Sequence, residues 1–283
     1  MTTGISGFTI LRNGIKFDYP FREAIKSLLP IVREMVVAVG KSEDDTLETV
    51  KRINSKKVRI IETVWDDSNR ADGSEFAKQT NVALAECKHP WAFYLQADEV
   101  LHENDLPVIT GEVQKYNDDL NIDGFSFKYI HFEATYDYYN PFRYRRAVRL
   151  IRNNQNIISI KDAAEFGKRD GKKLSIKKSN AHIYHYGWVK SPKVMLEKSK
   201  DFEKYWHDSE YIDDKYSGME EFDFKMLSAC KRFKGSHPEV MKNRISRWNI
   251  DLTHKVPKRP LPFRAITWHI LLRKWGIIKK EWF

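Results

Sequence analysis

The sequence is poor in the residues that cross-link small secreted proteins. Only two cysteines, Cys87 and Cys230, occur in 283 residues, and their separation matches neither a metal-binding pair nor a redox motif. A disulfide-stabilised fold is therefore excluded, and we expect a reducing compartment.

Long apolar runs are also missing. No stretch approaches the ~20 apolar residues that a membrane-spanning helix needs. Residues 1–7 contain no basic region followed by an apolar run, which is the pattern of a secretory signal. We therefore expect a cytoplasmic protein.

What the sequence does contain is enough apolar material for a large core. Hydrophobic residues make up 41% of the chain and aromatic residues 13%. A wholly disordered chain is excluded by this composition. The length allows one large domain, or a catalytic domain followed by an extension.

Charge is divided unequally along the chain. Residues 1–140 carry 16 Lys and Arg against 23 Asp and Glu, whereas residues 141–283 carry 33 against 16. The acidic half is suited to holding a cation, and the basic half is suited to anionic surfaces or substrates.

Apolar periodicity predicts alternating strands and helices over the first 100 residues, which is typical of βαβ units and a largely parallel sheet. The predicted strands are 8–11, 35–39, 58–61, 91–95, 124–130, 147–151 and 181–186, and the predicted helices are 21–29, 47–53, 74–87, 192–207 and 219–234. We expect an α/β domain over residues 1–190 and a basic helical extension over 191–283.

Polar residues follow three of these strands. They are the segments Arg12–Gly14, Gly40–Thr46 and Gln96–Glu99. Ligands of open parallel sheets bind beyond the carboxyl ends of the strands. An acid at such an end, here Asp98, can offer a hard cation an oxygen ligand in a fixed direction, although a turn or helix-cap role is the more common one for Asp.

Three motifs in order resemble the family 2 glycosyltransferases and the wider GT-A fold. Ser42–Thr46 is similar to the family's S-T-D-G-T-like turn, Gly73–Asn81 to its G-x-x-x-A-R-N-x-G-like helix start, and Trp91–Glu99 to its D-x-D strand end. The resemblance covers residues 5–105 and extends to about residue 190. Gln96 stands where the D-x-D motif has its first acid, and Val39 stands where many members have a nucleobase-binding Asp.

The resemblance implies a GT-A sheet and transfer of a sugar from a nucleotide-diphospho-sugar to a hydroxyl acceptor, with inversion. It implies that Asp98 holds Mn²⁺ or Mg²⁺ against the donor diphosphate. The residues that it places around the donor are Arg12, Gly40, Ser42, Asp44, Lys78, Gln96 and Ala97. A solvated helix face is the alternative for Lys78.

His185 is the second candidate metal ligand. Residues 181–188 alternate as a strand does, which places Ile183 and His185 on one face and His182 on the other. The resemblance implies that a histidine on this late segment completes the metal shell. A hydrogen-bonded structural histidine is the alternative.

A sugar transfer with inversion also needs a carboxylate that takes the proton of the acceptor hydroxyl. Asp162 and Glu165 follow a predicted strand and are the candidates, with Asp162 nearer the strand end. An exposed loop charge is the alternative for each.

The C-terminal segment 263–283 has an apolar stripe surrounded by basic residues. Such a helix can lie on an anionic membrane surface, at the inner face of the membrane in a cytoplasmic protein. Alternatively, it docks on the catalytic domain or on another subunit. The charge suits lipid-linked or phosphorylated acceptors.

Three other functions remain open at this point. A GT-A-like nucleotidyltransferase would carry a glycine-rich basic loop after the first strand, where this chain has Arg12–Lys16. A nucleic-acid-binding protein would suit the sequence pI of about 9.3, but no helix-turn-helix, zinc-finger or RNP-like motif accompanies the charge. A non-catalytic scaffold is the third, because Gln96 leaves the D-x-D motif incomplete.

Overall fold

The short apolar segments of the first hundred residues form four parallel strands. The structure is a computed structural model that describes residues 4–69, 72–224, 230–248 and 250. The parallel strands are β1 (Ile5–Leu11), β2 (Glu34–Gly40), β3 (Val58–Thr63) and β4 (Trp91–Tyr94). They lie in the order β3-β2-β1-β4, with Leu11 opposite Val39 and Phe8 opposite Tyr94.

The second half of the sheet is mainly antiparallel. It contains β5 (Glu99–Leu101), β6 (Gly124–Glu133), β7 (Thr135–Tyr139), β8 (Arg146–Arg152), β11 (Ile176–Trp188) and β12 (Lys231–Arg232). β8 joins β4 to β6, while the long strand β11 runs parallel to β6 and antiparallel to β5. Two further strands, β9 (Ile157–Ile160) and β10 (Glu165–Lys168), form a separate hairpin.

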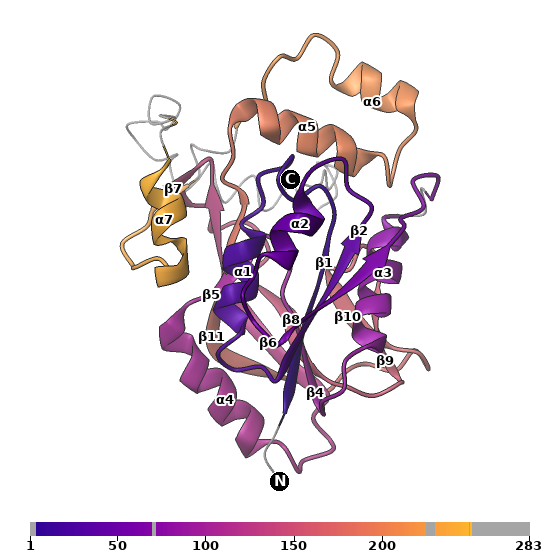
Figure 1. Ribbon diagram of the computed structural model, residues 1–283, viewed down its shortest axis with the longest axis vertical. Helices are drawn as coiled ribbons and strands as arrows, with labels where there is room; N and C mark the ends of the chain where they lie inside the picture. Colours follow the sequence, from indigo (N-terminus) through magenta and orange to yellow (C-terminus); the bar gives the residue numbers. More distant parts are fainter. Residues whose placement is uncertain (1–3, 70–71, 225–229, 249, 251–283) are drawn as a thin grey trace.

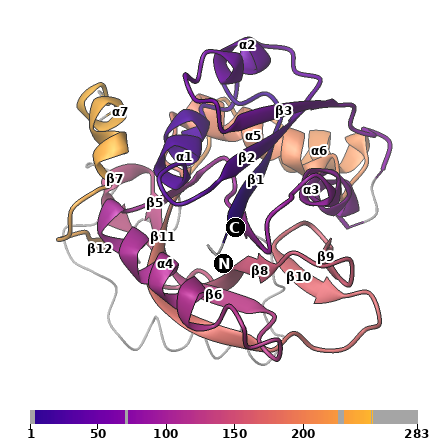
Figure 2. The ribbon, with the colours of Figure 1, turned by 60° about the horizontal axis from the view of Figure 1, so that its bottom comes forward.

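Helices cover both faces of the sheet (Figure 2). α1 (Phe21–Leu28), α2 (Thr46–Lys51) and α4 (Leu106–Lys115) contribute Ile25, Val50 and Ile109 to the apolar cluster on one face. α3 (Ser74–Ala85) and the β9–β10 hairpin contribute Leu84 and Phe166 to the cluster on the other face. The expected mixed, mostly parallel α/β sheet flanked by helices is therefore confirmed.

Among the residues that the structure describes, three helices follow β11. They are α5 (Pro192–Glu203), α6 (Ser209–Lys215) and α7 (Lys242–Ser246), and two short 3-10 turns occur at Glu103–Asp105 and Glu239–Met241. In Figure 1, α5 lies across the end of the sheet at which β1 and β2 terminate. This position brings side chains of α5 to the polar strand ends.

One predicted helix is wrong. The described residues of the segment 219–234, which are 219–224 and 230–234, form bends, irregular chain and β12 rather than a helix. Phe222 packs on Phe224 and Trp188, and its backbone N–H donates to the carbonyl of Pro192 at 3.1 Å. Tertiary contacts therefore account for the apolar residues that suggested a helical face.

Within the described ranges, no helix is long and apolar enough to cross a membrane. The amphipathic segment 263–283 lies outside the described residues.

Candidate functional site

The polar residues that follow β1, β2 and β4 lie side by side, because these strands are parallel neighbours. The carbonyl of Phe8 in β1 accepts from the N–H of Leu95 at 3.1 Å, which extends the pairing past the end of β4. Asp98 follows three residues later. The predicted grouping of polar strand ends at one edge of the sheet is observed.

Asp98 and His185 meet at this edge. The backbone N–H of Tyr186 donates to the carbonyl of Asp98 at 2.8 Å, and β11 places His185 opposite Glu99. Asp98 Oδ2 is 3.7 Å from His185 Nε2, and both residues are buried. The two predicted metal ligands, 87 positions apart in the chain, are thus in direct proximity.

The space between the two side chains depends on Gly187. A Cβ atom at position 187 would collide with Asp98 Oδ2 and would lie 2.8 Å from His185 Nε2. The absent side chain therefore leaves a cradle between a carboxylate and an imidazole, which are ligands suited to Mn²⁺. The residues present fit a divalent cation in this respect.

The cradle alone does not complete a metal shell. In the part of the chain that the structure describes, no group of three or more His, Cys, Asp or Glu side chains is arranged to hold an ion. Asp98 and His185 would supply two ligands. The remaining positions would have to be filled by water or by oxygen atoms of a bound substrate.

Positive charges surround the Asp98 carboxylate. Lys198 of α5 places its Nζ 3.6 Å from Asp98 Oδ2 and donates to the carbonyl of Gly187 at 2.9 Å. The buried Lys190 donates to the carbonyl of Asp18 at 3.0 Å. Burial alone would raise the pKa of Asp98, but the positive charges around it, including those of Lys198 and Lys190, hold it below its usual value. Asp98 is therefore an anion at neutral pH.

The two lysines pack around one aromatic ring. Lys190 Nζ is 4.5 Å and Lys198 Nζ 5.0 Å from the centre of the Tyr19 ring. Burial lowers the pKa of both lysines, and most strongly that of Lys190. An anionic ligand entering here would meet poorly hydrated ammonium groups, which strengthens the attraction.

Both histidines of the site are held neutral. Burial lowers the pKa of His185, and it lowers that of His131, whose ring lies against His185, well below the usual 6.5. Neutral imidazole is the form that ligates metal ions.

A buried ion pair supports the segment that carries Asp98. Glu99 accepts from Arg149 Nε and Nη2 at 2.9 Å each and from the hydroxyl of Tyr129 at 2.7 Å. Its Oε2 also accepts from the backbone N–H of Gln96 at 3.1 Å. Glu99 therefore fixes the turn of Gln96 and Ala97 instead of facing the cradle.

A second polar group forms around Arg12 at the end of β1. Its guanidinium makes a two-point ion pair with Asp67, donates to the hydroxyl of Tyr205 at 3.0 Å and donates to the carbonyl of Lys41 at 3.2 Å. The partners come from three distant segments. Arg12 thus joins the ends of β1 and β2 to the segment that follows α5.

The loop after β2 is braced by the predicted residues Ser42 and Asp44. Ser42 Oγ accepts from the N–H of Asn13 at 3.0 Å, and Asp44 Oδ2 accepts from the N–H of Lys16 at 2.6 Å. The indole of Trp65 covers Gly40 so closely that no Cβ would fit there. The Trp65 Nε1 is buried and has no hydrogen-bond partner among the described atoms.

Lys78 lies farther from these contacts. Its side chain is 59% exposed, and its Nζ is 3.5 Å from the buried carboxylate of Glu75 on the same helix. The structure therefore groups Arg12, Gly40, Ser42 and Asp44 at one place and Gln96, Ala97, Asp98 and His185 at another, with Lys78 on the surface of α3.

The two candidate bases occupy the β9–β10 hairpin. Asp162 lies between Lys161 and Ala163, which both have positive φ, and the Cβ of Asp162 is close to Gly73. Arg149, the partner of Glu99, also donates to the carbonyl of Ala164 at 3.0 Å. The buried ion pair thus connects the Asp98 segment to the hairpin that carries Asp162.

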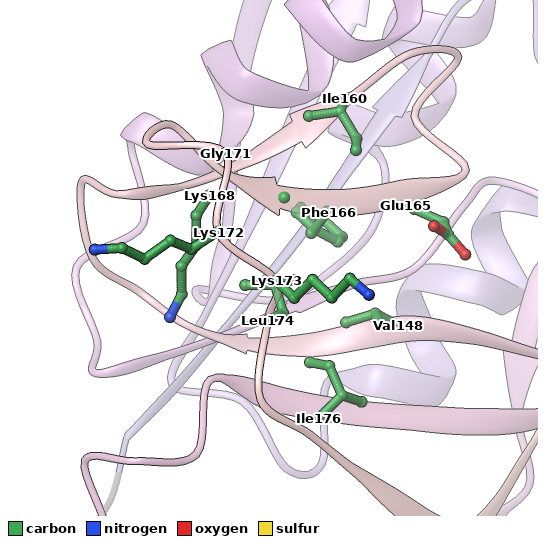
Figure 3. Close-up of a pocket in the computed structure, with 11 residues that line it drawn as sticks. Val148, Ile160, Glu165, Phe166, Lys168, Gly171, Lys172, Lys173, Leu174 and Ile176 are labelled. Atoms are coloured by element: carbon green, nitrogen blue, oxygen red, sulfur yellow. The ribbon is translucent and has the colours of Figure 1, made fainter.

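Glu165 is exposed and lines a cavity of about 390 Å³ (Figure 3). The lining includes the apolar Val148 and Phe166 as well as the basic Lys172 and Lys173. Neither Asp162 nor Glu165 makes a hydrogen bond or ion pair with Asp98 or His185 among the described contacts.

Sequence reasoning missed Lys198, Arg149 and His131. Lys198 is one lysine among many in a basic half, so only the position of α5 identifies it. Glu99 lies within the D-x-D-like segment Trp91–Glu99. An acid at the end of a buried strand needs a cationic partner, and this requirement could have indicated a residue such as Arg149.

No protein-family model matches the sequence, and no curated protein matches it. Several solved structures are similar in fold. One is the complex of S. aureus TarS residues 1–349 with UDP-GlcNAc, at a TM-score of 0.41 and 12% identity over 75% of this chain and 70% of that chain. A mycobacterial protein gives a TM-score of 0.44 and 11% identity over 73% and 76% of the two chains.

The mannosyltransferase PcManGT from Pyrobaculum calidifontis, in complex with GDP-Man and Mn²⁺, is similar over a smaller part. It has a TM-score of 0.35 and 16% identity, and it covers 47% of this chain and 36% of that chain. At these scores the likeness assigns neither substrate nor activity to this chain.

Proposed function

We propose that the chain is a glycosyltransferase that moves a sugar from a nucleotide-diphospho-sugar to a hydroxyl acceptor, with inversion and with Mn²⁺ or Mg²⁺ as cofactor. The observation that carries the proposal is the cradle of Asp98, His185 and Gly187 at the carboxyl edge of a parallel sheet. Ligands bind at this edge of open α/β sheets. The three ordered motifs of the sequence support the same reading.

The donor diphosphate would lie at the cradle, beside Lys198. Asp98 and His185 would hold the cation, and a divalent ion supplies Lewis-acid neutralisation of the charge on a departing diphosphate. Lys198 would add a direct charge-assisted hydrogen bond to a phosphate oxygen. The Arg12 group and the loop braced by Ser42 and Asp44 would contact the nucleoside.

Asp162 would act on the acceptor. Its carboxylate would take the proton of the acceptor hydroxyl as that oxygen bonds to the anomeric carbon, while the bond from this carbon to the diphosphate oxygen breaks. Asp162 is favoured over Glu165 because it lies nearer the end of β9, whereas Glu165 is exposed and lines the separate cavity of the hairpin. We propose residues 1–190 as the catalytic domain, to which α5 adds Lys198.

A binding screen tests the proposal. Thermal unfolding is followed with nucleoside diphosphates and nucleotide-sugars, each with and without Mn²⁺. A ligand at about 100 times its Kd stabilises the folded state by about 2.7 kcal/mol, which is readily measured. We expect stabilisation by at least one nucleotide that depends on Mn²⁺ and is lost in Asp98→Asn. If the nucleotide and Mn²⁺ stabilise Asp98→Asn as much as the wild type, the cradle is not part of the donor site.

A further inference from the structure

A second histidine, His131, contacts the Nδ1 atom of His185, whereas the Nε2 atom of His185 faces Asp98. The Nδ1 atoms of His131 and His185 are 3.2 Å apart, on adjacent strands β6 and β11 where the two residues are paired. The other nitrogen of His131, Nε2, is 2.8 Å from the backbone carbonyl of Tyr144. Three groups therefore form a chain that ends at the His185 Nε2, which faces Asp98.

The chain determines where the protons lie. A carbonyl oxygen only accepts hydrogen bonds, so Nε2 of His131 must carry a proton. His131 is 2% exposed, and burial disfavours the charged imidazolium, so its Nδ1 has a lone pair and accepts. His185 must then donate from its own Nδ1.

This tautomer leaves a lone pair on His185 Nε2. The lone pair is directed toward the Asp98 carboxylate, 3.7 Å away, across the space that Gly187 leaves open. Two acceptors that face each other repel unless a cation lies between them. Metal-ligating histidines typically donate their second nitrogen to a partner that fixes the tautomer in this way.

We propose that His131 is a positioning residue that directs the Nε2 lone pair of His185 toward a divalent cation. The carbonyl of Tyr144 fixes the tautomer of His131, and His131 in turn fixes that of His185. The inference rests on the proposed function, because it requires the cation site at Asp98. It adds that the site depends on a residue that does not contact the ion.

The variants His131→Asn and His131→Phe separate this role from packing. The Oδ1 of Asn can stand near the position of Nδ1 and accept from His185, but the amide does not fill the volume of the ring. The Phe ring preserves the contacts with Tyr129 and Tyr144, whose ring centres are 5.1 and 4.9 Å or less from their neighbours, but it accepts no hydrogen bond. Tyr144→Phe is the matched control, since it changes the same cluster and keeps the carbonyl.

Binding of Mn²⁺ alone is measured by electron paramagnetic resonance at pH 7.5 on the full chain, with circular dichroism to confirm folding. We expect His131→Phe to weaken Mn²⁺ binding by about 10- to 100-fold, the usual effect of removing such a partner. His131→Asn should bind more tightly than His131→Phe, and Tyr144→Phe should bind as the wild type does.

Four results would overturn the inference. If Phe binds Mn²⁺ as well as the wild type, the hydrogen bond is not needed. If Phe binds more tightly than Asn, His131 acts through packing. If Asp98→Asn binds Mn²⁺ as well as the wild type does, the ion is bound elsewhere. If the wild type does not bind Mn²⁺ at millimolar concentrations, the inference and the cofactor part of the proposed function both fail.

Discussion

Glu99 and Arg149 form a two-point ion pair directly behind the candidate site, with both side chains almost completely buried. Removing one partner leaves an uncompensated buried charge, so Arg149→Leu should lower the free energy of unfolding by about 3–5 kcal/mol. Urea denaturation measures this change. Lys51→Ala, which opens the exposed Lys51–Glu48 pair, is the control and should leave the midpoint unaltered. A loss below about 1 kcal/mol in Arg149→Leu would contradict the account, because breaking a buried ion pair costs more than that.

Gly187 is the residue whose small size creates the cradle. Gly187→Ala should abolish detectable Mn²⁺ binding and cost about 1–3 kcal/mol of stability through overpacking. Gly111→Ala is a matched control, because a Cβ at position 111 in α4 meets nothing within 4 Å. It should raise stability by about 0.5–1 kcal/mol, since alanine is the better helix former, and leave Mn²⁺ binding unchanged. Retained Mn²⁺ binding in Gly187→Ala would place the ion outside the cradle.

Two lysines can be compared for their contribution to diphosphate binding. Lys198 lies beside Asp98 with its side chain 14% exposed, whereas Lys78 is largely exposed beside Glu75. Hydrogen bonds to charged groups contribute about 1.5–3 kcal/mol, so Lys198→Met should weaken binding of a nucleoside diphosphate by about tenfold or more. Lys78→Met should have the smaller effect, because solvent screens exposed charges. Calorimetric titration measures the affinity of both variants for the nucleoside diphosphate. A larger loss of affinity in Lys78→Met than in Lys198→Met would indicate that the diphosphate lies along α3.

The buried histidines make stability depend on pH. Burial holds the pKa values of His131 and His185 below the 6.5 of the unfolded chain. As pH falls below 6.5 the unfolded chain takes up protons that the folded chain resists, so stability decreases; above 6.5 this contribution is constant. The slope reaches at most about 1.4 kcal/mol per pH unit for each histidine.

Urea unfolding at a series of pH values between 5 and 7.5 checks this dependence. His131→Asn should show a shallower slope than the wild type over the same range. An identical slope in the two proteins would mean that His131 titrates in the folded state as it does in the unfolded chain.

The parallel strands and their polar ends could be predicted from sequence because both signals are local. Apolar runs mark β1, β2 and β4, and each run is followed by turn-forming and charged residues. The pairing of Asp98 with His185 was predicted only through family resemblance, yet the structure brings the two together.

The remaining features depend on contacts between distant segments. Arg149, His131 and Lys198 reach the site from β8, β6 and α5, and no local pattern distinguishes them from other basic residues. The predicted helix at 219–234 failed for a related reason. Phe222 and Phe224 face Trp188 and Met195 across the fold, so their spacing follows a packed surface rather than a helical turn.

Turnover of a nucleotide-sugar tests the central claim most directly. Release of the nucleoside diphosphate is measured with Mn²⁺ and the nucleotide-sugar that stabilises the protein most, in wild type, Asp98→Asn, Asp162→Asn and, as a control, Glu165→Gln. The account predicts release by wild type and Glu165→Gln, and none above background by Asp98→Asn or Asp162→Asn. Undiminished release by Asp98→Asn, or none by wild type with any donor, would contradict the assignment of the Asp98–His185 cradle as a glycosyltransferase donor site.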